Sequence, residues 1–374
     1  MADPRRLYLH VGLQKTGTSY LQAALLAGAD GLAAQGLDLV PPSKRECFEL
    51  MVVVRNRYES RRDEESDRNI VERFRAQLDR ATGSRAVFSQ ESLAGAGPGQ
   101  IVRLLEMCGD REVHVVVTVR DLARQLPSSW QEHVKAGGTA RLERYLRKLQ
   151  RLEEAGRLKQ PWIHLDAAGV LRRWSKALGP ERMHLVTVPP PGSPLTLLLE
   201  RFSSVLEVDP GLLVPEDRPS NSSLGRVQVD LLRRVNAELP DEVHRRYVYN
   251  DVVKRSFGTQ VLGRQAGERS LVPAEFRAWC EAAAERQIAA LAAAGYRVEG
   301  SLDDLRCPDA AFDIGSGRPR ERDVAASAVS ALATLLAERG ETEAERRTGA
   351  IRVDRPGVLD RLRPRRTGRS TAAE

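Results

Sequence analysis

Short, continuous apolar runs alternate with longer amphipathic segments through the first half of the chain. The runs are rich in Val and Leu and are largely continuous rather than alternating, which is typical of strands covered on both faces. Because helical segments separate these runs, right-handed crossovers and a parallel sheet are expected. The predicted strands are Leu7–Val11, Leu37–Val40, Ala86–Ser89, Glu112–Val119 and Met183–Val188, with a last short strand at Tyr296–Val298.

The segments between the strands carry apolar residues at helical spacing. The predicted helices of the first half are Ser19–Ala27, Arg68–Ala81, Gly99–Met107, Ser128–Lys135, Ala140–Glu154 and Asp166–Leu178. After Pro191 the pattern is mostly helical, with predicted helices at Leu195–Leu206, Gly225–Leu239, Glu242–Arg255 and Pro273–Ala294. The pattern therefore predicts an α/β protein with three layers, α/β/α, around a central parallel sheet, followed by a helical second half.

The net charge of +7 over 374 residues lies almost entirely at the C-terminal end. Residues 346–374 hold nine arginines against three acids, a net of +6, which leaves +1 for the rest of the chain. We therefore expect a main domain over 1–304, a linker with an isolated helix over 305–345, and a disordered basic tail over 346–374. Nucleic acid is not expected to bind the main domain, and the partner of the tail stays open.

The composition points to a protein of the cytoplasm. No run of 18 uncharged apolar residues predicts a membrane span, and no apolar signal-peptide core precedes the first strand. The four cysteines have no C-x-x-C pairing and no neighbouring histidine, so neither a zinc site nor a disulfide framework is predicted.

A Gly-rich turn follows the first strand and carries the most informative residues. The segment Gly12–Ser19 has the sequence G-L-Q-K-T-G-T-S between a strand and a helix. Backbone N–H groups at such a helix start, together with the helix dipole, bind anions. The predicted anion ligands are Lys15, Thr16, Gly17, Thr18 and Ser19. The loop differs from the phosphate loop of nucleotide triphosphatases, in which the lysine follows the second glycine rather than preceding it.

A second anion site is predicted at the end of the strand Glu112–Val119. Arg120 follows this strand directly, at the sheet edge where open α/β sheets bind ligands, and Ser128 comes eight residues later. An arginine at a strand end and a serine at a helix start can bind one phosphate together. Taken alone, Arg120 could instead pair with Asp121, and Ser128 could be a simple N-cap.

The two motifs together resemble those of sulfotransferases that use 3′-phosphoadenosine 5′-phosphosulfate (PAPS), of the bacterial type. The resemblance spans roughly residues 5–300. It implies that the Lys15 loop binds the 5′-phosphosulfate, that Arg120 and Ser128 hold the 3′-phosphate, and that transfer of the sulfuryl group to a hydroxyl needs no metal. Further segments that look like the family are W-I-H-L-D (162–166), R-R-W (172–174), H-L-V-T-V-P (184–189) and N-S-S-L-G (221–225).

Removal of the proton from the acceptor hydroxyl calls for a general base near the donor. Glu91 is the first candidate, because it follows the strand Ala86–Ser89 at the edge that should face the donor. In the related enzymes a His or Glu at about this place takes the role. His10 is the second candidate, and His133 the third.

Two other functions stay open from the sequence. A kinase or ATPase would need an acid at the strand end to hold Mg²⁺, and Arg120 stands there instead. A non-catalytic nucleotide-binding protein could use its basic tail to bind a partner. For an enzyme, the acceptor could be a carbohydrate, a lipid or a small metabolite, and the sequence does not distinguish them.

Overall fold

The computed structural model describes residues 5–57, 69–157, 159–194, 196–214, 223–313, 315 and 318–348. In this part of the chain, one six-stranded sheet has the order β2-β3-β1-β4-β5-β7, with all neighbours parallel. Its strands are β1 (Arg6–Gly12), β2 (Leu37–Leu39), β3 (Arg85–Ser89), β4 (Glu112–Val119), β5 (Met183–Thr187) and β7 (Arg297–Glu299). Every predicted strand is present, and its ends lie within one residue of the prediction. The predicted fold class is confirmed.

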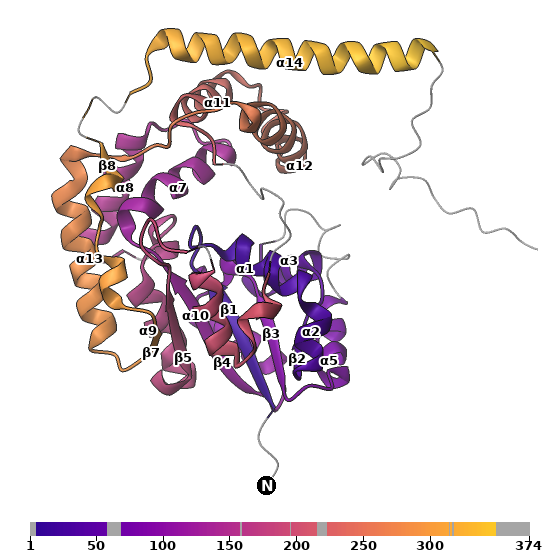
Figure 1. Ribbon diagram of the computed structural model, residues 1–374, viewed down its shortest axis with the longest axis vertical. Helices are drawn as coiled ribbons and strands as arrows, with labels where there is room; N and C mark the ends of the chain where they lie inside the picture. Colours follow the sequence, from indigo (N-terminus) through magenta and orange to yellow (C-terminus); the bar gives the residue numbers. More distant parts are fainter. Residues whose placement is uncertain are drawn as a thin grey trace, which may run out of the picture.

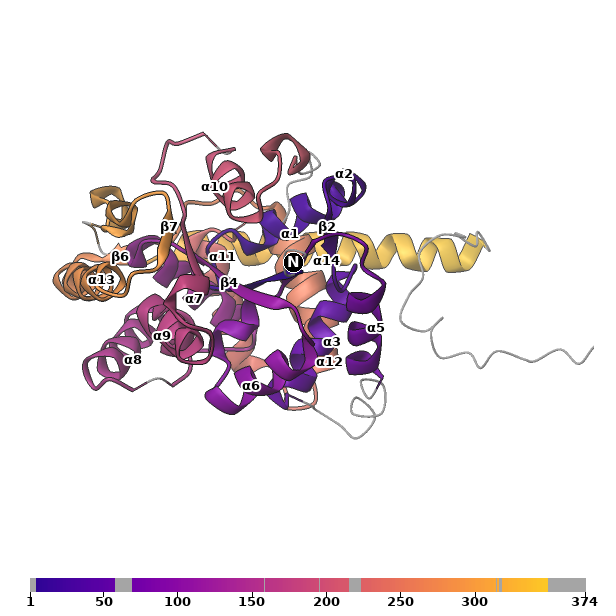
Figure 2. The same cartoon turned by 90° about the horizontal axis from the view of Figure 1, so that it is seen from below.

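Helices cover both faces of this sheet, as Figure 2 shows from the end of the molecule. The helices on one face are α3 (Lys44–Arg55), α5 (Ile70–Arg80), α6 (Pro98–Met107) and α9 (Ala167–Leu178). Those on the other face are α1 (Thr18–Ala27), α2 (Ala29–Ala34) and α10 (Leu197–Leu206).

The central strand β1 contributes to both cores, which explains its unbroken apolar sequence. Leu7 and Leu9 pack with Trp174 on one face, and Tyr8 packs with Phe202 on the other. These side chains are at most 1% exposed. Burial of one such side chain contributes about 2 kcal/mol.

A third core lies beyond the carboxyl ends of the strands, above the sheet in Figure 1. It is built from α7 (Leu122–Lys135), α8 (Leu142–Glu154), α11 (Arg226–Glu238), α13 (Arg277–Ala292), the π-helix η5 (Tyr249–Val261) and a two-stranded sheet of β6 (Val272–Pro273) and β8 (Phe312–Asp313). Short helical turns complete the chain: η1 (Glu91–Gly95), η2 (Trp162–His164), η3 (Pro180–Arg182), η4 (Pro210–Leu212), α12 (Arg246–Val248), η6 (Leu262–Arg264), η7 (Ala274–Phe276), η8 (Leu302–Leu305) and η9 (Asp309–Ala311).

The long helix α14 (Glu321–Thr348) crosses the top of the molecule in Figure 1. Val324 and Ala331 on its inner face are buried in the third core, where α14 packs against α11. The basic tail predicted for 346–374 lies outside the described residues except for its first three, and so do Asn221 and Ser222 of the N-S-S-L-G segment. Among the described residues, no helix is both long and apolar enough to cross a membrane.

Three local predictions were wrong. The helix expected to start at Ser128 starts at Leu122, because the carboxylate of Asp121 accepts the N–H of Arg124 at 2.8 Å and caps it there. Pro127 therefore lies inside the helix. The charged stretch from Lys44, where no helix is predicted, forms α3, capped by Ser43. Most of the α-helix expected over Glu242–Arg255 is turn and π-helix.

Candidate functional site

The loop between β1 and α1 has the strand–turn–helix form of an anion site. Gly12 has φ 127° and Gly17 has φ 87°, both in the region that favours glycine. A Cβ atom would lie 2.8 Å from the carbonyl oxygen of Glu91 at Gly12, and 2.8 Å from a methyl of Leu198 at Gly17. Both glycines are therefore needed for this turn, which stands at the carboxyl end of a central strand.

The polar groups of this loop divide into two sets. The N–H groups of residues 15–19 donate to no acceptor within the described part of the chain, and they lie where α1 begins. This arrangement suits an anion. The Thr16 hydroxyl has a different role, because it donates to the carbonyl of Leu13 at 2.7 Å and lies 2.6 Å from the hydroxyl of Thr118. Its side chain is buried and fastens the loop to β4. Thr18 is also buried, whereas Gly17 and Ser19 are exposed.

Lys15 shares a carboxylate with a second lysine. Its Nζ lies 2.8 Å from Oε2 of Glu132 on α7, and Nζ of Lys254 on η5 lies 2.5 Å from Oε1 of the same residue. Burial alone would raise the pKa of Glu132, but the two ammonium groups outweigh this effect and lower it to about 2. Glu132 is therefore ionised at neutral pH, and the three side chains carry a net charge of +1.

Arg120 and Ser128 line one pocket of about 390 Å³, which we call the arginine pocket. It also contains Arg124, Gln131, Ser223, Arg269 and Ser270, with apolar walls from Ala123, Pro127, Pro191, Leu224, Leu271, Pro308, Ala310 and Ala311. Three arginines thus face a space in which none of the described lining residues is a carboxylate. The two predicted 3′-phosphate ligands are brought together, although Ser128 lies between one and two turns inside its helix and not at its start.

Arg120 has unused hydrogen-bonding capacity. Its Nε is buried and has no partner among the described residues. One terminal nitrogen reaches the carbonyl of Lys15 at 3.5 Å, which joins the arginine pocket to the loop. Burial, followed by the charge of Arg124, lowers the pKa of Arg120 to about 10, so it stays protonated at neutral pH. The neighbouring Asp121 does not neutralise it, because the Asp121 carboxylate is fully buried and pairs with Arg124.

Glu91 is placed beside the loop. It begins η1 directly after β3, its main chain packs against Gly12, and its Oε2 accepts a hydrogen bond from Gln22 of α1 at 3.0 Å. The side chain is half-buried. The carboxylate therefore lies at the sheet edge that carries the loop.

The two candidate histidines are placed differently. His10 is fully buried, and its ring nitrogens lie 2.8 Å from the Ser89 hydroxyl and 3.3 Å from that of Thr118. Burial lowers the pKa of His10 to about 3. The ring of His133 stacks on Tyr145 of α8, with centroids 5.2 Å apart. Neither ring contacts the Lys15–Glu132–Lys254 group.

Sequence reasoning missed three basic residues of the site. Arg124 precedes Ser128 by one helical turn, and an earlier helix start at Asp121 would have put both on one face. Arg269 and Lys254 come from segments far along the chain with no motif around them, so no local signal points to them.

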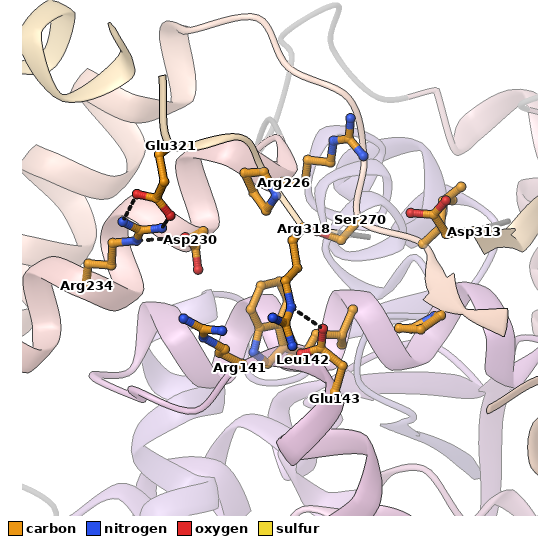
Figure 3. Close-up of a pocket in the computed structure, with 14 residues that line it drawn as sticks. Arg141, Leu142, Glu143, Arg226, Asp230, Arg234, Ser270, Asp313, Arg318 and Glu321 are labelled. Carbon is orange, nitrogen blue, oxygen red and sulfur yellow. Dashed lines mark hydrogen bonds and ion pairs between the residues drawn. The ribbon is translucent and has the colours of Figure 1, made fainter. Parts of the chain in front are cut away.

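A second pocket, of about 190 Å³, lies on the other side of Ser270 and Leu271 (Figure 3). We call it the ion-pair pocket. Two of its arginines point at carboxylates: Arg234 pairs with Asp230 and Glu321 at 2.7–2.8 Å, and Arg318 lies 3.6 Å from Glu143. These pairs join the start of α14 to α8 and α11. Among the described residues, no group of three or more His, Cys, Asp or Glu side chains is arranged to hold a metal ion.

Comparison with known proteins gives one structural likeness. No protein-family model matches the chain, and no curated protein matches it. Among solved structures, the crystal structure of a sulfotransferase from Alicyclobacillus acidocaldarius is similar, with 17% identity over 82% of this chain and 100% of that chain, and a TM-score of 0.40. At this level of similarity, the proposals below depend on the chemistry of this chain's own residues.

Proposed function

We propose that the protein is a sulfotransferase that moves a sulfuryl group from PAPS to the hydroxyl of an acceptor. The observation that carries this proposal is the pair of anion-binding elements joined by Arg120. One is the loop with five N–H groups without an acceptor among the described residues, and the other is the arginine pocket. A donor with phosphate groups at both its 5′ and 3′ ends matches two such elements, whereas ATP has none at the 3′ position.

In this proposal the 5′-phosphosulfate binds the N–H groups of residues 15–19 and the ammonium of Lys15. The 3′-phosphate accepts hydrogen bonds from Arg120, Arg124, Arg269 and the Ser128 hydroxyl, all of which line the arginine pocket. The unpartnered Nε of Arg120 supports this role, since a buried guanidinium N–H without an acceptor is costly. The apolar walls at Leu224, Leu271 and Pro308 suit the adenosine.

The reaction is an in-line displacement at sulfur. The acceptor oxygen bonds to sulfur while the bond from sulfur to the bridging oxygen breaks, and the electron pair of that bond stays on the phosphate. Lys15 stabilises the charge that develops on this leaving oxygen. Glu91 takes the hydroxyl proton. His10 is the weaker candidate for base, because both of its nitrogens are engaged and its pKa is about 3.

The kinase alternative has less support from the geometry. The first carboxylate after β4 is Asp121, and both of its oxygens are engaged by Arg124 inside the protein. The acceptor in this proposal is a hydroxyl compound, either a small metabolite or a carbohydrate or lipid.

The test is a binding assay with purified protein by calorimetry and thermal shift. We expect adenosine 3′,5′-bisphosphate to bind and to raise the melting temperature without metal, and AMP and ATP to do so far less. Lys15→Ala should weaken the bisphosphate, whereas Lys176→Ala on the exposed face of α9 serves as the matched control. Stabilisation by ATP that requires Mg²⁺, with none by the bisphosphate, would replace this proposal with the kinase one.

A further inference from the structure

The carboxylate of Glu132 holds two ammonium groups next to the anion loop. Nζ of Lys15 lies 2.8 Å from one oxygen and Nζ of Lys254 lies 2.5 Å from the other. Each ammonium has three N–H donors and spends one on Glu132, so two remain on each. The side chains of Lys15, Glu132 and Lys254 are 32%, 33% and 39% exposed, which leaves the group accessible to a ligand.

The backbone position of Lys254 is fixed because the helix that carries it packs into the third core. It stands within η5, a 13-residue π-helix, whose residues Tyr249, Val253 and Val261 are buried in the third core. π-Helical turns are rare and occur frequently at functional sites. The carbonyl of Lys254 accepts the hydroxyl of Thr259 at 3.0 Å, which ties its backbone to the next turn.

Stability alone gives little reason for the second lysine. One lysine already neutralises Glu132, and the second repels the first across a single carboxylate. A half-exposed ion pair contributes about 0–1 kcal/mol, which does not favour gathering an excess positive charge there. Lys135, half-buried at the end of α7, adds a further positive charge, and within the described residues none of these three lysines pairs with a carboxylate other than Glu132. The surplus charge suits an anion that arrives with the substrate.

We propose that Lys254 is a second catalytic cation, which contacts the non-bridging oxygens of the sulfuryl group while Lys15 stays with the bridging oxygen. Glu132 is the positioning residue that keeps both ammonium groups at the loop. This inference rests on the proposed function. The chemical step is the same as in the proposed function. The acceptor oxygen bonds to sulfur, the bond between sulfur and the bridging oxygen of the phosphate breaks, and the hydroxyl proton passes to Glu91.

The experiment compares two ligands that differ only in the sulfuryl group, PAPS and adenosine 3′,5′-bisphosphate. In Lys254→Ala, we expect the affinity for PAPS to fall about tenfold or more, and that for the bisphosphate to change less than about threefold. Lys254→Arg should restore part of the preference for PAPS. Lys176→Ala is again the matched control. An unchanged ratio of the two affinities in Lys254→Ala overturns the inference.

A second variant separates direct contact from an effect through Lys15. If Lys254 acts only by weakening the ion pair between Glu132 and Lys15, then Lys254→Ala should have no effect in a Glu132→Gln background. Direct contact predicts that the loss of preference for PAPS persists in the double variant, and its disappearance there overturns the catalytic role. Failure of the wild-type protein to bind the bisphosphate would instead contradict the proposed function, so the two failures are distinguishable.

Discussion

The arginine pocket and the ion-pair pocket lie back to back and share Ser270 and Leu271 as a wall, yet their charges are handled in opposite ways. In the ion-pair pocket four arginines meet four carboxylates, and Arg234 alone makes ion pairs with two of them. Among the described residues that line the arginine pocket, three arginines meet no carboxylate, and Arg124 pairs with Asp121 behind the lining.

This difference distinguishes a structural contact between helices, the ion-pair pocket, from a ligand-binding site, the arginine pocket. Paired charges are satisfied within the protein, so a ligand would have to displace them at a cost. Unpaired guanidinium groups, of which Arg120 is half-buried, retain donors that only an incoming anion can satisfy. Pocket size alone would not distinguish the two, because both are large enough for a small molecule.

Low pH should lower the free energy of unfolding before it changes the charges of either pocket, and this is the largest effect we expect. Burial lowers the pKa of His10 and His164 to about 3 and that of His184 to about 4. The unfolded chain, with ordinary histidines near pH 6.5, then binds more protons, so stability is present above pH 6.5 and is lost as the pH falls toward 3. Each histidine should cost about 2 kcal/mol by pH 5.

Neither pocket has a histidine in its lining, and the pKa of Glu132 at about 2 keeps its ion pairs intact over the same range. Urea denaturation at pH 7.5 and pH 5 measures the loss of stability, and His184→Gln should reduce it. A stability that is flat between these two pH values would contradict the burial of neutral histidines.

Arg120→Ala is the sharpest test of the arginine pocket. We expect the Kd for adenosine 3′,5′-bisphosphate to rise about a hundredfold, because charge-assisted hydrogen bonds to one phosphate are lost. The Kd for AMP, which lacks the 3′-phosphate, should change little. Arg318→Ala in the ion-pair pocket is the matched control and should leave both values unchanged. Equal losses in the two variants would remove the distinction between the pockets.

The sequence predicts the sheet and the first anion loop because both are local. The central strands are largely apolar runs, and the residues of the loop lie within eight positions, Gly12–Ser19. The arginine pocket is only half predicted: Arg120 and Ser128 belong to one strand–helix connection, whereas Arg269 arrives from a segment 149 positions after Arg120. Lys254 could not be foreseen, since nothing in its own neighbourhood predicts a π-helix or a carboxylate on α7.

The helix start at Leu122 shows why boundaries fail. Pro127 suggested the first turn of a helix, since proline is common there. The Asp121 carboxylate accepts the N–H of Arg124 and so caps the helix earlier in the chain. This cap overrides the preference of proline and adds about one and a half turns before Pro127. The same cap buries Asp121 against Arg124 and leaves Arg120 without an ion-pair partner among the described residues. One local interaction thus decides both the helix and the charge of the site.

Asp230→Ala tests whether the ion pairs of the ion-pair pocket stabilise the fold. The Asp230 carboxylate accepts hydrogen bonds from Arg233 and Arg234 at 2.8 Å, and the side chain of Arg233 is 11% exposed. Loss of this carboxylate leaves the guanidinium of Arg233 buried without its partner, and we expect unfolding to become easier by about 2 kcal/mol. Nucleotide affinity should stay within about twofold of wild type. A large loss of affinity with unchanged stability would show that this pocket, and not its neighbour, binds the ligand.

Ser128→Ala should have the smallest effect, confined to affinity. The Ser128 hydroxyl faces the arginine pocket, and its bond within the protein is to the carbonyl of Arg124 one turn earlier, at 3.1 Å. Its removal should raise the Kd for the bisphosphate about fivefold and leave the melting temperature unchanged. Ser129→Ala is the matched control, because Ser129 bonds to the hydroxyl of Tyr145 at 2.7 Å and does not line the pocket. Calorimetry that finds the same change in affinity for both serines would mean that α7 acts only as a scaffold, and that the phosphate contacts come from the arginines alone.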